Sequence, residues 1–188
     1  MEKKNRINNY SDNSVGILSQ TSGVGKNTNI KGNGFTIFMN NNESFGVESC
    51  SLHNQSRTCL SNTKQLNNIK LVKGSLSHIE LNNSTINISG DNSYGVYSNG
   101  NGSSIDLNNL NLNVDKETSS GFALYNGNIN INNSHIESKG IGFISQGNSV
   151  VTINNSNINS KGNLINSSKG FTLNSNNSSI NGNIKQKK

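Results

Sequence analysis

The sequence predicts an all-β protein, a right-handed parallel β-helix with three short strands per coil. A short phrase recurs along the chain, and apolar residues fall into columns when the phrases are superposed. Composition points the same way. Only 29% of the 188 residues are hydrophobic and 5% are aromatic, with no Pro or Trp, so order through repetition is favoured over one large globular core.

The recurring phrase has the form apolar-Asn-Asn-x-x-apolar. It occurs as Leu81-Asn-Asn-Ser-Thr-Ile86, Leu107-Asn-Asn-Leu-Asn-Leu112, Ile131-Asn-Asn-Ser-His-Ile136, Ile153-Asn-Asn-Ser-Asn-Ile158 and, shortened, Asn176-Asn-Ser-Ser-Ile180. The first Asn falls at positions 82, 108, 132, 154 and 176, at intervals of 26, 24, 22 and 22 residues. A drifting period is typical of stacked coils that tolerate small insertions. The main alternative, an antiparallel sandwich, leaves these columns without a cause.

Superposition of the phrases defines the first strand of each coil. One inward column contains Ile79, Ile105, Ile129, Val151 and Phe171. A second contains Leu81, Leu107, Ile131, Ile153 and Leu173, provided that a two-residue insertion follows Leu173. The position between the two columns carries Glu80, Asp106, Asn130, Thr152 and Thr172, which we expect to face solvent because strand side chains alternate.

Two further strands complete each coil. The second strand points inward at Ile86, Leu112, Ile136, Ile158 and Ile180. The third begins at a small-residue and apolar motif: Ser14 to Ile17, Ser44 to Val47, Ser93 to Val96, Gly121 to Leu124 and Ile141 to Ile144. Asn suits the bends between strands because it tolerates the left-handed backbone conformation and its amide can hydrogen-bond from coil to coil.

A period of about 24 residues predicts about seven to eight coils. We expect residues 1–13 to form an N-terminal tail or partial cap, residues 14–184 the β-helix, and residues 185–188 a basic C-terminal tail. Gly46 and Gly95 are 49 positions apart, an interval interpreted as about two coils with an excursion at Cys50 to Cys59.

The two cysteines, Cys50 and Cys59, lie nine positions apart with mostly polar residues between them. They predict a local disulfide if the protein is exported, with two free thiols as the alternative. A metal site needs more ligands than His53 supplies. A loop of this kind either clips an insertion or contributes to partner binding. The candidate partner-binding residues are His53, Asn54, Gln55 and Arg57.

Charge sets further limits on function. The net charge of +6 comes largely from basic residues near both ends, a pattern of solvating tails, so no nucleic-acid partner is expected. A modest attraction to sulfated glycans is expected to weaken with salt.

No apolar run is long enough to span a bilayer, so this segment is not expected to insert into a membrane. The basic start lacks the apolar stretch of a signal peptide, so we expect an export signal outside this sequence.

The sequence predicts no catalytic residues, no cofactor and no metal. Glu80 and Asp106 on adjacent coils are interpreted as solvated surface acids, with a shared weak cation as the alternative. His53, His78 and His135 have no Asp or Cys partner at a telling spacing and are interpreted as ordinary residues. Carboxylates are scarce for a polysaccharide lyase or hydrolase, which remains a remote alternative.

The coils resemble the pertactin-like passenger domains of bacterial autotransporters over residues 14–184. The resemblance rests on phrases such as Ile86-Asn-Ile-Ser-Gly-Asp-Asn-Ser-Tyr-Gly-Val-Tyr97 followed by Ser104-Ile-Asp-Leu-Asn-Asn109. It implies an isolated passenger or part of one, secreted or held at the bacterial surface, that binds host-cell protein or glycan as an adhesin or virulence factor. A released, growth-factor-like ligand of a host receptor is the alternative. The Gly-Asp-Ser-Gly serine motif of enzymatic members does not occur here.

Overall fold

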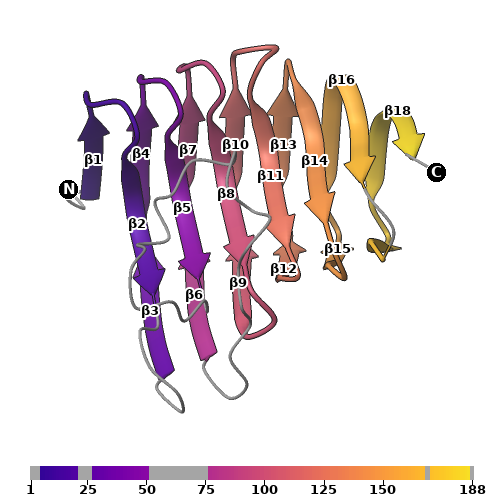
Figure 1. Ribbon diagram of the computed structural model, residues 1–188, viewed down its shortest axis with the longest axis horizontal. Helices are drawn as coiled ribbons and strands as arrows, with labels where there is room; N and C mark the ends of the chain where they lie inside the picture. The colour runs from indigo at the N-terminus through magenta and orange to yellow at the C-terminus, as the bar shows by residue number, and fades with distance from the viewer. Residues whose placement is uncertain (1–4, 21–26, 51–75, 168–169, 187–188) are drawn as a thin grey trace.

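The computed structural model describes residues 5–20, 27–50, 76–167 and 170–186. In these residues all regular structure is β-strand, and every strand pairing is parallel. Successive turns stack along the long axis of the molecule from the N-terminus to the C-terminus (Figure 1). The predicted parallel β-helix is therefore confirmed. No helix among the described residues is long and apolar enough to cross a membrane.

Each turn contributes one strand to each of three faces. The first face consists of β1 (Asn5–Asn9), β4 (Phe35–Met39), β7 (Thr85–Ile88), β10 (Asn111–Val114), β13 (His135–Ser138) and the beginnings of β16 (Asn157–Ser167) and β18 (Ser179–Gln186). The second consists of β2 (Val15–Gln20), β5 (Phe45–Cys50), β8 (Tyr94–Asn99), β11 (Ser120–Tyr125), β14 (Ile141–Gln146) and the ends of β16 and β18. The third consists of β3 (Asn27–Asn33), β6 (Leu76–Asn82), β9 (Ser103–Asn108), β12 (Asn128–Asn132), β15 (Val150–Asn154) and β17 (Thr172–Asn176).

The rod has about six turns, since the third face holds six strands, so the expected seven to eight coils were too many. The error lies in the interval between Gly46 and Gly95. Phe45 pairs directly with Tyr94, so the interval of 49 positions from one to the other is one turn and not two. Residues 51–75 fall within that interval and lie outside the described residues.

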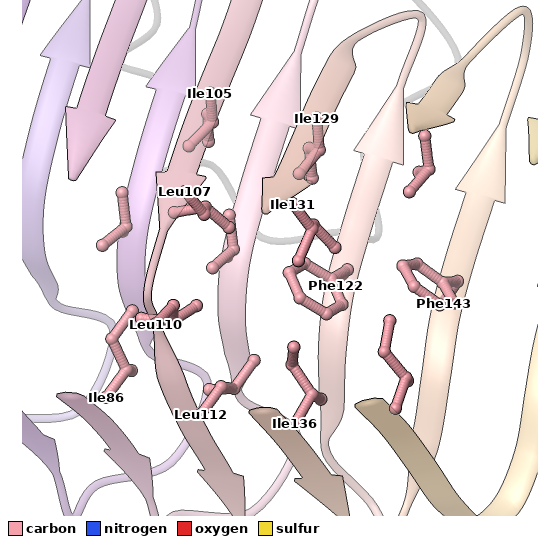
Figure 2. Packing of buried hydrophobic residues seen from close by; sticks show 14 of the residues in the cluster. Ile86, Ile105, Leu107, Leu110, Leu112, Phe122, Ile129, Ile131, Ile136 and Phe143 are labelled. Atoms are coloured by element: carbon pink, nitrogen blue, oxygen red, sulfur yellow. The ribbon is translucent and has the colours of Figure 1, made fainter. Parts of the chain in front are cut away.

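The predicted inward columns form the core (Figure 2). Ile86, Leu112 and Ile136 stack in register on the first face, and each is fully buried. On the second face the rings of Phe122 and Phe143 stack with centroids 4.9 Å apart. Parallel in-register strands place equivalent side chains above one another, so a column of apolar residues continues from turn to turn.

The predicted register of the last coil was wrong by two residues. Leu173 pairs with Val151, and Ser175 pairs with Ile153, so no insertion follows Leu173. The spacing of 22 residues simply continues, and Asn174 takes the outward position expected for Thr172. Phe171 precedes the strand, and its ring lies 6.4 Å from that of Phe143.

The ends of the rod reach into the ranges assigned to tails. Strand β1 lies within residues 1–13 and pairs with β4, so that Ile7 continues the column of Ile37. Strand β18 runs to Gln186, and Ile184 pairs with Ile165.

Asn residues bend the chain between the third and first faces. Five of them, Asn83, Asn109, Asn133, Asn155 and Asn177, have φ of 51°, 55°, 51°, 50° and 47° respectively. The Nδ2 of Asn109 donates to Oδ1 of Asn83 over 2.8 Å. A parallel ladder runs through Asn82, Asn108, Asn132, Asn154 and Asn176 with spacings of 2.8 to 2.9 Å. The predicted role of Asn at the bends is confirmed.

Replacing Asn109 with Ala is expected to lower the free energy of unfolding by about 1–2 kcal/mol, because Ala is strained in the left-handed region. Asn109→Gly loses the same side-chain hydrogen bond without that strain. Urea denaturation of both variants separates the two contributions. Equal losses in the two variants would show that backbone conformation is not what selects Asn at this bend.

Candidate functional site

The outward surface of the third face carries a group of paired charges. Lys31 Nζ lies 2.7 Å from Glu80 Oε2, and Asn82 Nδ2 donates to Glu80 Oε1 over 3.2 Å. The hydrogen bonds from Lys31 and Asn82 hold the pKa of Glu80 below its usual value, and Glu80 raises the pKa of Lys31. The Glu80 carboxylate is therefore ionised and already neutralised by a lysine of the same chain.

His78, for which the sequence spacing indicated no Asp or Cys partner, has an Asp neighbour from the next turn. His78 Nδ1 lies 2.8 Å from Ser104 Oγ, and His78 Nε2 lies 3.6 Å from Asp106 Oδ2. Asn130 Nδ2 donates to the other oxygen of Asp106. These residues come from three neighbouring strands, β6, β9 and β12, so their proximity depends on the register between turns. Spacing within one segment of sequence could not reveal it.

This cluster contains the residue types of a serine–histidine–aspartate triad on the outward surface of a sheet. The side chains of His78 and Asp106 are 26% and 34% exposed. Glu80 and Asp106 each have a partner within the protein. Among the described residues no group of three or more His, Cys, Asp or Glu side chains is arranged to hold a metal ion.

A shallow groove lined mainly by Asn and Ser residues, the polar groove, follows the bend between the third and first faces along the axis of the rod. Its volume is about 680 Å³, and it crosses four successive turns. It is lined by Asn109, Leu110, Asn111, Asn133, Ser134, His135, Asn155, Ser156, Asn157, Asn177 and Ser179. The groove thus presents a repeated set of amide and hydroxyl groups, with one imidazole, at the spacing of adjacent strands.

The floor and the walls of the groove differ in their hydrogen bonding. On the floor, Ser134 Oγ accepts from the backbone N–H of Leu110 over 3.0 Å and donates to the carbonyl of Asn132 over 2.7 Å. On the wall, the side-chain amides of Asn111 and Asn157 make no hydrogen bond to another described residue. Each of these amides offers two donors and one acceptor oxygen to a ligand.

His135 lies in the same wall, and its Nε2 is 3.3 Å from Glu137 Oε1. This wall was not predicted from the sequence. Its members share the position just before the second inward residue of the phrase, and they are Asn111, His135, Asn157 and Ser179. Thr85 holds the same position one turn before the groove. When the repeated phrases are superposed, this position forms a column of polar residues, and that column predicts the wall.

The residues predicted for partner binding are not among the described ones. His53, Asn54, Gln55 and Arg57 lie outside the described residues, as does Cys59. Cys50 ends β5 and is fully buried. The binding role of the loop and the Cys50–Cys59 disulfide remain predictions.

The charged cluster and the polar groove therefore occupy neighbouring parts of the surface, one on the third face and one at its bend into the first. The function must be argued from their chemistry. No known protein family, no curated protein and no solved structure matches this chain.

Proposed function

We propose that this protein is an extracellular binding module of the bacterial surface, of the autotransporter-passenger type, that holds a host-surface glycan along its polar groove. The observation that carries the proposal is that the side-chain amides of Asn111 and Asn157, two residues of the groove wall, make no hydrogen bond to another described residue. Amide and hydroxyl groups pair well with sugar hydroxyls, which both donate and accept hydrogen bonds. Function as a released ligand of a host receptor is the alternative within the same class.

The length and regularity of the groove fit an extended polymer better than a small compact ligand. Adjacent strands are about 4.8 Å apart, so the same side chains recur along the groove at that interval. A chain of sugars laid along the axis contacts several turns at once, and each contact adds a modest free energy. The lining contains no Lys, Arg, Asp or Glu, so the groove selects hydroxyl groups, while the net charge of +6 adds an attraction to sulfated chains.

The double variant Asn111→Ala/Asn157→Ala is expected to weaken glycan binding about tenfold or more, because each lost hydrogen bond contributes about 1 kcal/mol. The measurement is affinity for a panel of immobilised neutral and sulfated glycans, followed at low and physiological salt. Thr152→Ala is the matched control, since Thr152 faces outward on the third face beside the groove and does not line it.

Three results would decide against the proposal. The first is no glycan retained above a neutral control protein. The second is equal binding by the double variant and the parent. The third is release of reducing or unsaturated ends from acidic polysaccharides. Such release would mean that the protein is a polysaccharide lyase or hydrolase, and His78 and Asp106 would then be the candidate catalytic residues.

A further inference from the structure

Three polar side chains lie side by side in one outward column of the third face. In register, Ser104 of β9 pairs with His78 of β6 on one side and with Asn128 of β12 on the other. All three point away from the core, because strand side chains alternate and their neighbours along each strand are buried. Neighbouring strands are about 4.8 Å apart, so a hydroxyl lies between an imidazole and an amide (Figure 1).

The hydroxyl of Ser104 contacts the imidazole of His78. Ser104 Oγ lies 2.8 Å from His78 Nδ1, and His78 Nε2 lies 3.6 Å from Asp106 Oδ2. The Asp106 carboxylate favours the tautomer with the proton on Nε2, because that N–H then points toward negative charge. Nδ1 is left as the basic nitrogen and accepts the Ser104 O–H. An imidazole between a hydroxyl and a carboxylate is the arrangement that activates a serine.

The neighbouring side chains fix the carboxylate that orients His78. Asn130 Nδ2 donates to Oδ1 of Asp106 over 2.6 Å. Glu80 lies next to Asp106 in register, but its carboxylate is paired with Lys31 Nζ at 2.7 Å. Lysine therefore neutralises one of the two acids, and the other lies within ion-pair distance of the imidazole.

Asn128 supplies a hydrogen-bond donor on the opposite side of Ser104 from His78. Its side chain is exposed, and its side-chain amide makes no hydrogen bond to another described residue. A side-chain amide N–H stabilises the oxyanion that forms when a hydroxyl adds to a carbonyl group. Three successive turns thus supply a nucleophile, a base with its orienting acid, and an oxyanion donor.

We propose that Ser104, His78 and Asn128 form a catalytic site that hydrolyses short-chain acyl esters, with Asp106 as a positioning residue. Ser104 Oγ bonds to the ester carbonyl carbon while its proton passes to His78 Nδ1, and Asn128 Nδ2 donates to the oxyanion. The bond to the alcohol oxygen then breaks, and the alcohol leaves with the proton from His78. Water, which gives a proton to His78 in the same way, attacks the acyl-serine, releases the carboxylic acid and restores the Ser104 hydroxyl.

The openness of the site sets the substrate class. The side chains of His78 and Asp106 are 26% and 34% exposed, and neither residue lines the polar groove. Polar neighbours give a long acyl chain little apolar surface to contact, so acetyl and similarly short groups on an accessible hydroxyl are favoured. Ester hydrolysis releases neither reducing nor unsaturated ends. This activity therefore goes beyond glycan binding and is tested apart from it.

The first test is hydrolysis of p-nitrophenyl acetate by the full chain, followed by the absorbance of the released p-nitrophenol. Ser104→Ala and His78→Gln are each expected to lower kcat/KM about a hundredfold. Asp106→Asn is expected to lower kcat and leave KM unchanged, because Asp106 orients the base and does not touch the ester. Circular dichroism first establishes that each variant is folded.

His135→Gln is the matched control. His135 is also an outward imidazole beside a carboxylate, with Nε2 3.3 Å from Glu137 Oε1, but its neighbours in register are Asn111 and Asn157 and not a serine. Imidazole by itself hydrolyses activated esters slowly. A rate that came from imidazole alone would fall equally in the two histidine variants, whereas the proposed site is lost in one of them and retained in the other.

Covalent labelling identifies the nucleophile. A fluorophosphonate forms an Oγ–phosphorus bond to an activated serine and loses fluoride, and tandem mass spectrometry locates the added mass. We expect the label on Ser104 in the parent and in His135→Gln, and no label in His78→Gln. The proposal is overturned by a parent no more active than Ser104→Ala, by a label on another serine, or by equal losses in the two histidine variants. Ser104 does not line the polar groove, so Ser104→Ala should still bind glycan, and the two proposals fail separately.

Discussion

Replacing Ile153 with Asp is expected to unfold the turns around β15, with a loss of about 4 kcal/mol or more from the free energy of unfolding. Ile153 is fully buried and is stacked in register on Ile131. Loss of the apolar side chain alone costs about 2–5 kcal/mol, and a carboxylate without a partner adds the cost of burying or protonating it. Domains of this kind are stable by only about 5–15 kcal/mol, so this single change consumes much of the total.

Thr152→Asp introduces the same charge one residue earlier and is expected to be mild. Thr152 points to the opposite side of β15, toward solvent, between Asn130 and Asn174 of the neighbouring turns. Circular dichroism during urea denaturation measures both variants. If the two aspartates proved equally damaging, the assignment of inward and outward positions would be wrong for this strand. Ile131→Asp with Asn130→Ser repeats the comparison one turn away.

The contrast between these neighbours shows why the core of this fold was predictable. Period-2 alternation sets Ile153 apart from Thr152 within one strand, and the recurring Asn-Asn pair aligns each strand with the next. Both signals are local and repeat in each turn, so an error in one turn is corrected by the others. Columns, bends and Asn ladders all follow from them.

The number and register of the turns were harder to predict because they depend on where the repeat is interrupted. Nothing in residues 51–75 repeats, so length alone suggested an extra coil, whereas Phe45 in fact pairs with Tyr94. At the other end Phe171 and Leu173 both fit an apolar column. Only the constant spacing between Asn154 and Asn176 distinguishes the two registers.

Surface chemistry between turns was the least predictable part. The contacts of His78 with Ser104 and Asp106 arise from residues in separate turns, and neither forms a motif within its own strand. The amides of Asn111 and Asn157 are hidden in a sequence where Asn is common and usually serves the ladders. The Asn-rich composition that makes the fold easy to recognise therefore hides the positions where an Asn side chain makes no hydrogen bond to another described residue.

Glu48 is the buried residue that these patterns missed most completely. It lies between Val47 and Ser49 in β5, and its neighbours in register are Leu18 in the turn before and Tyr97 in the turn after. It has no exposed surface, and neither carboxylate oxygen has a hydrogen-bond partner within the described part of the chain. A lone Glu in a strand is ordinarily interpreted as a surface residue, so the burial of Glu48 was not predicted from the sequence.

Tyr97 belongs to a second cluster, separate from the main core, with Phe45 and Ala123. The rings of Phe45 and Tyr97 stack with centroids 5.3 Å apart. Burial in this apolar setting raises the pKa of Glu48 from its ordinary value of 4.5 to about 8. Burial, together with the Glu48 carboxylate, also raises the pKa of Tyr97, so Tyr97 stays neutral over the same range.

The stability of the protein is therefore expected to fall as pH rises from about 4.5 to about 8. In that window the folded protein keeps the Glu48 proton while the unfolded chain loses it, so alkali favours unfolding by at most about 1.4 kcal/mol per pH unit. Below the window both states are protonated and the full stability is present; above it the loss is complete. Urea midpoints measured across this range give the profile.

Glu48→Gln is expected to remove this contribution, because the amide has nearly the shape of the protonated acid and does not ionise. The variant should match the parent near pH 4.5 and exceed it in stability at pH 8, where the parent must bury a carboxylate or take up a proton. Glu137→Gln is the matched control, since the Glu137 side chain is 44% exposed and its replacement should leave the slope in place. Parallel profiles for the parent and Glu48→Gln would mean that the buried carboxyl has a partner or a route to solvent that satisfies its charge.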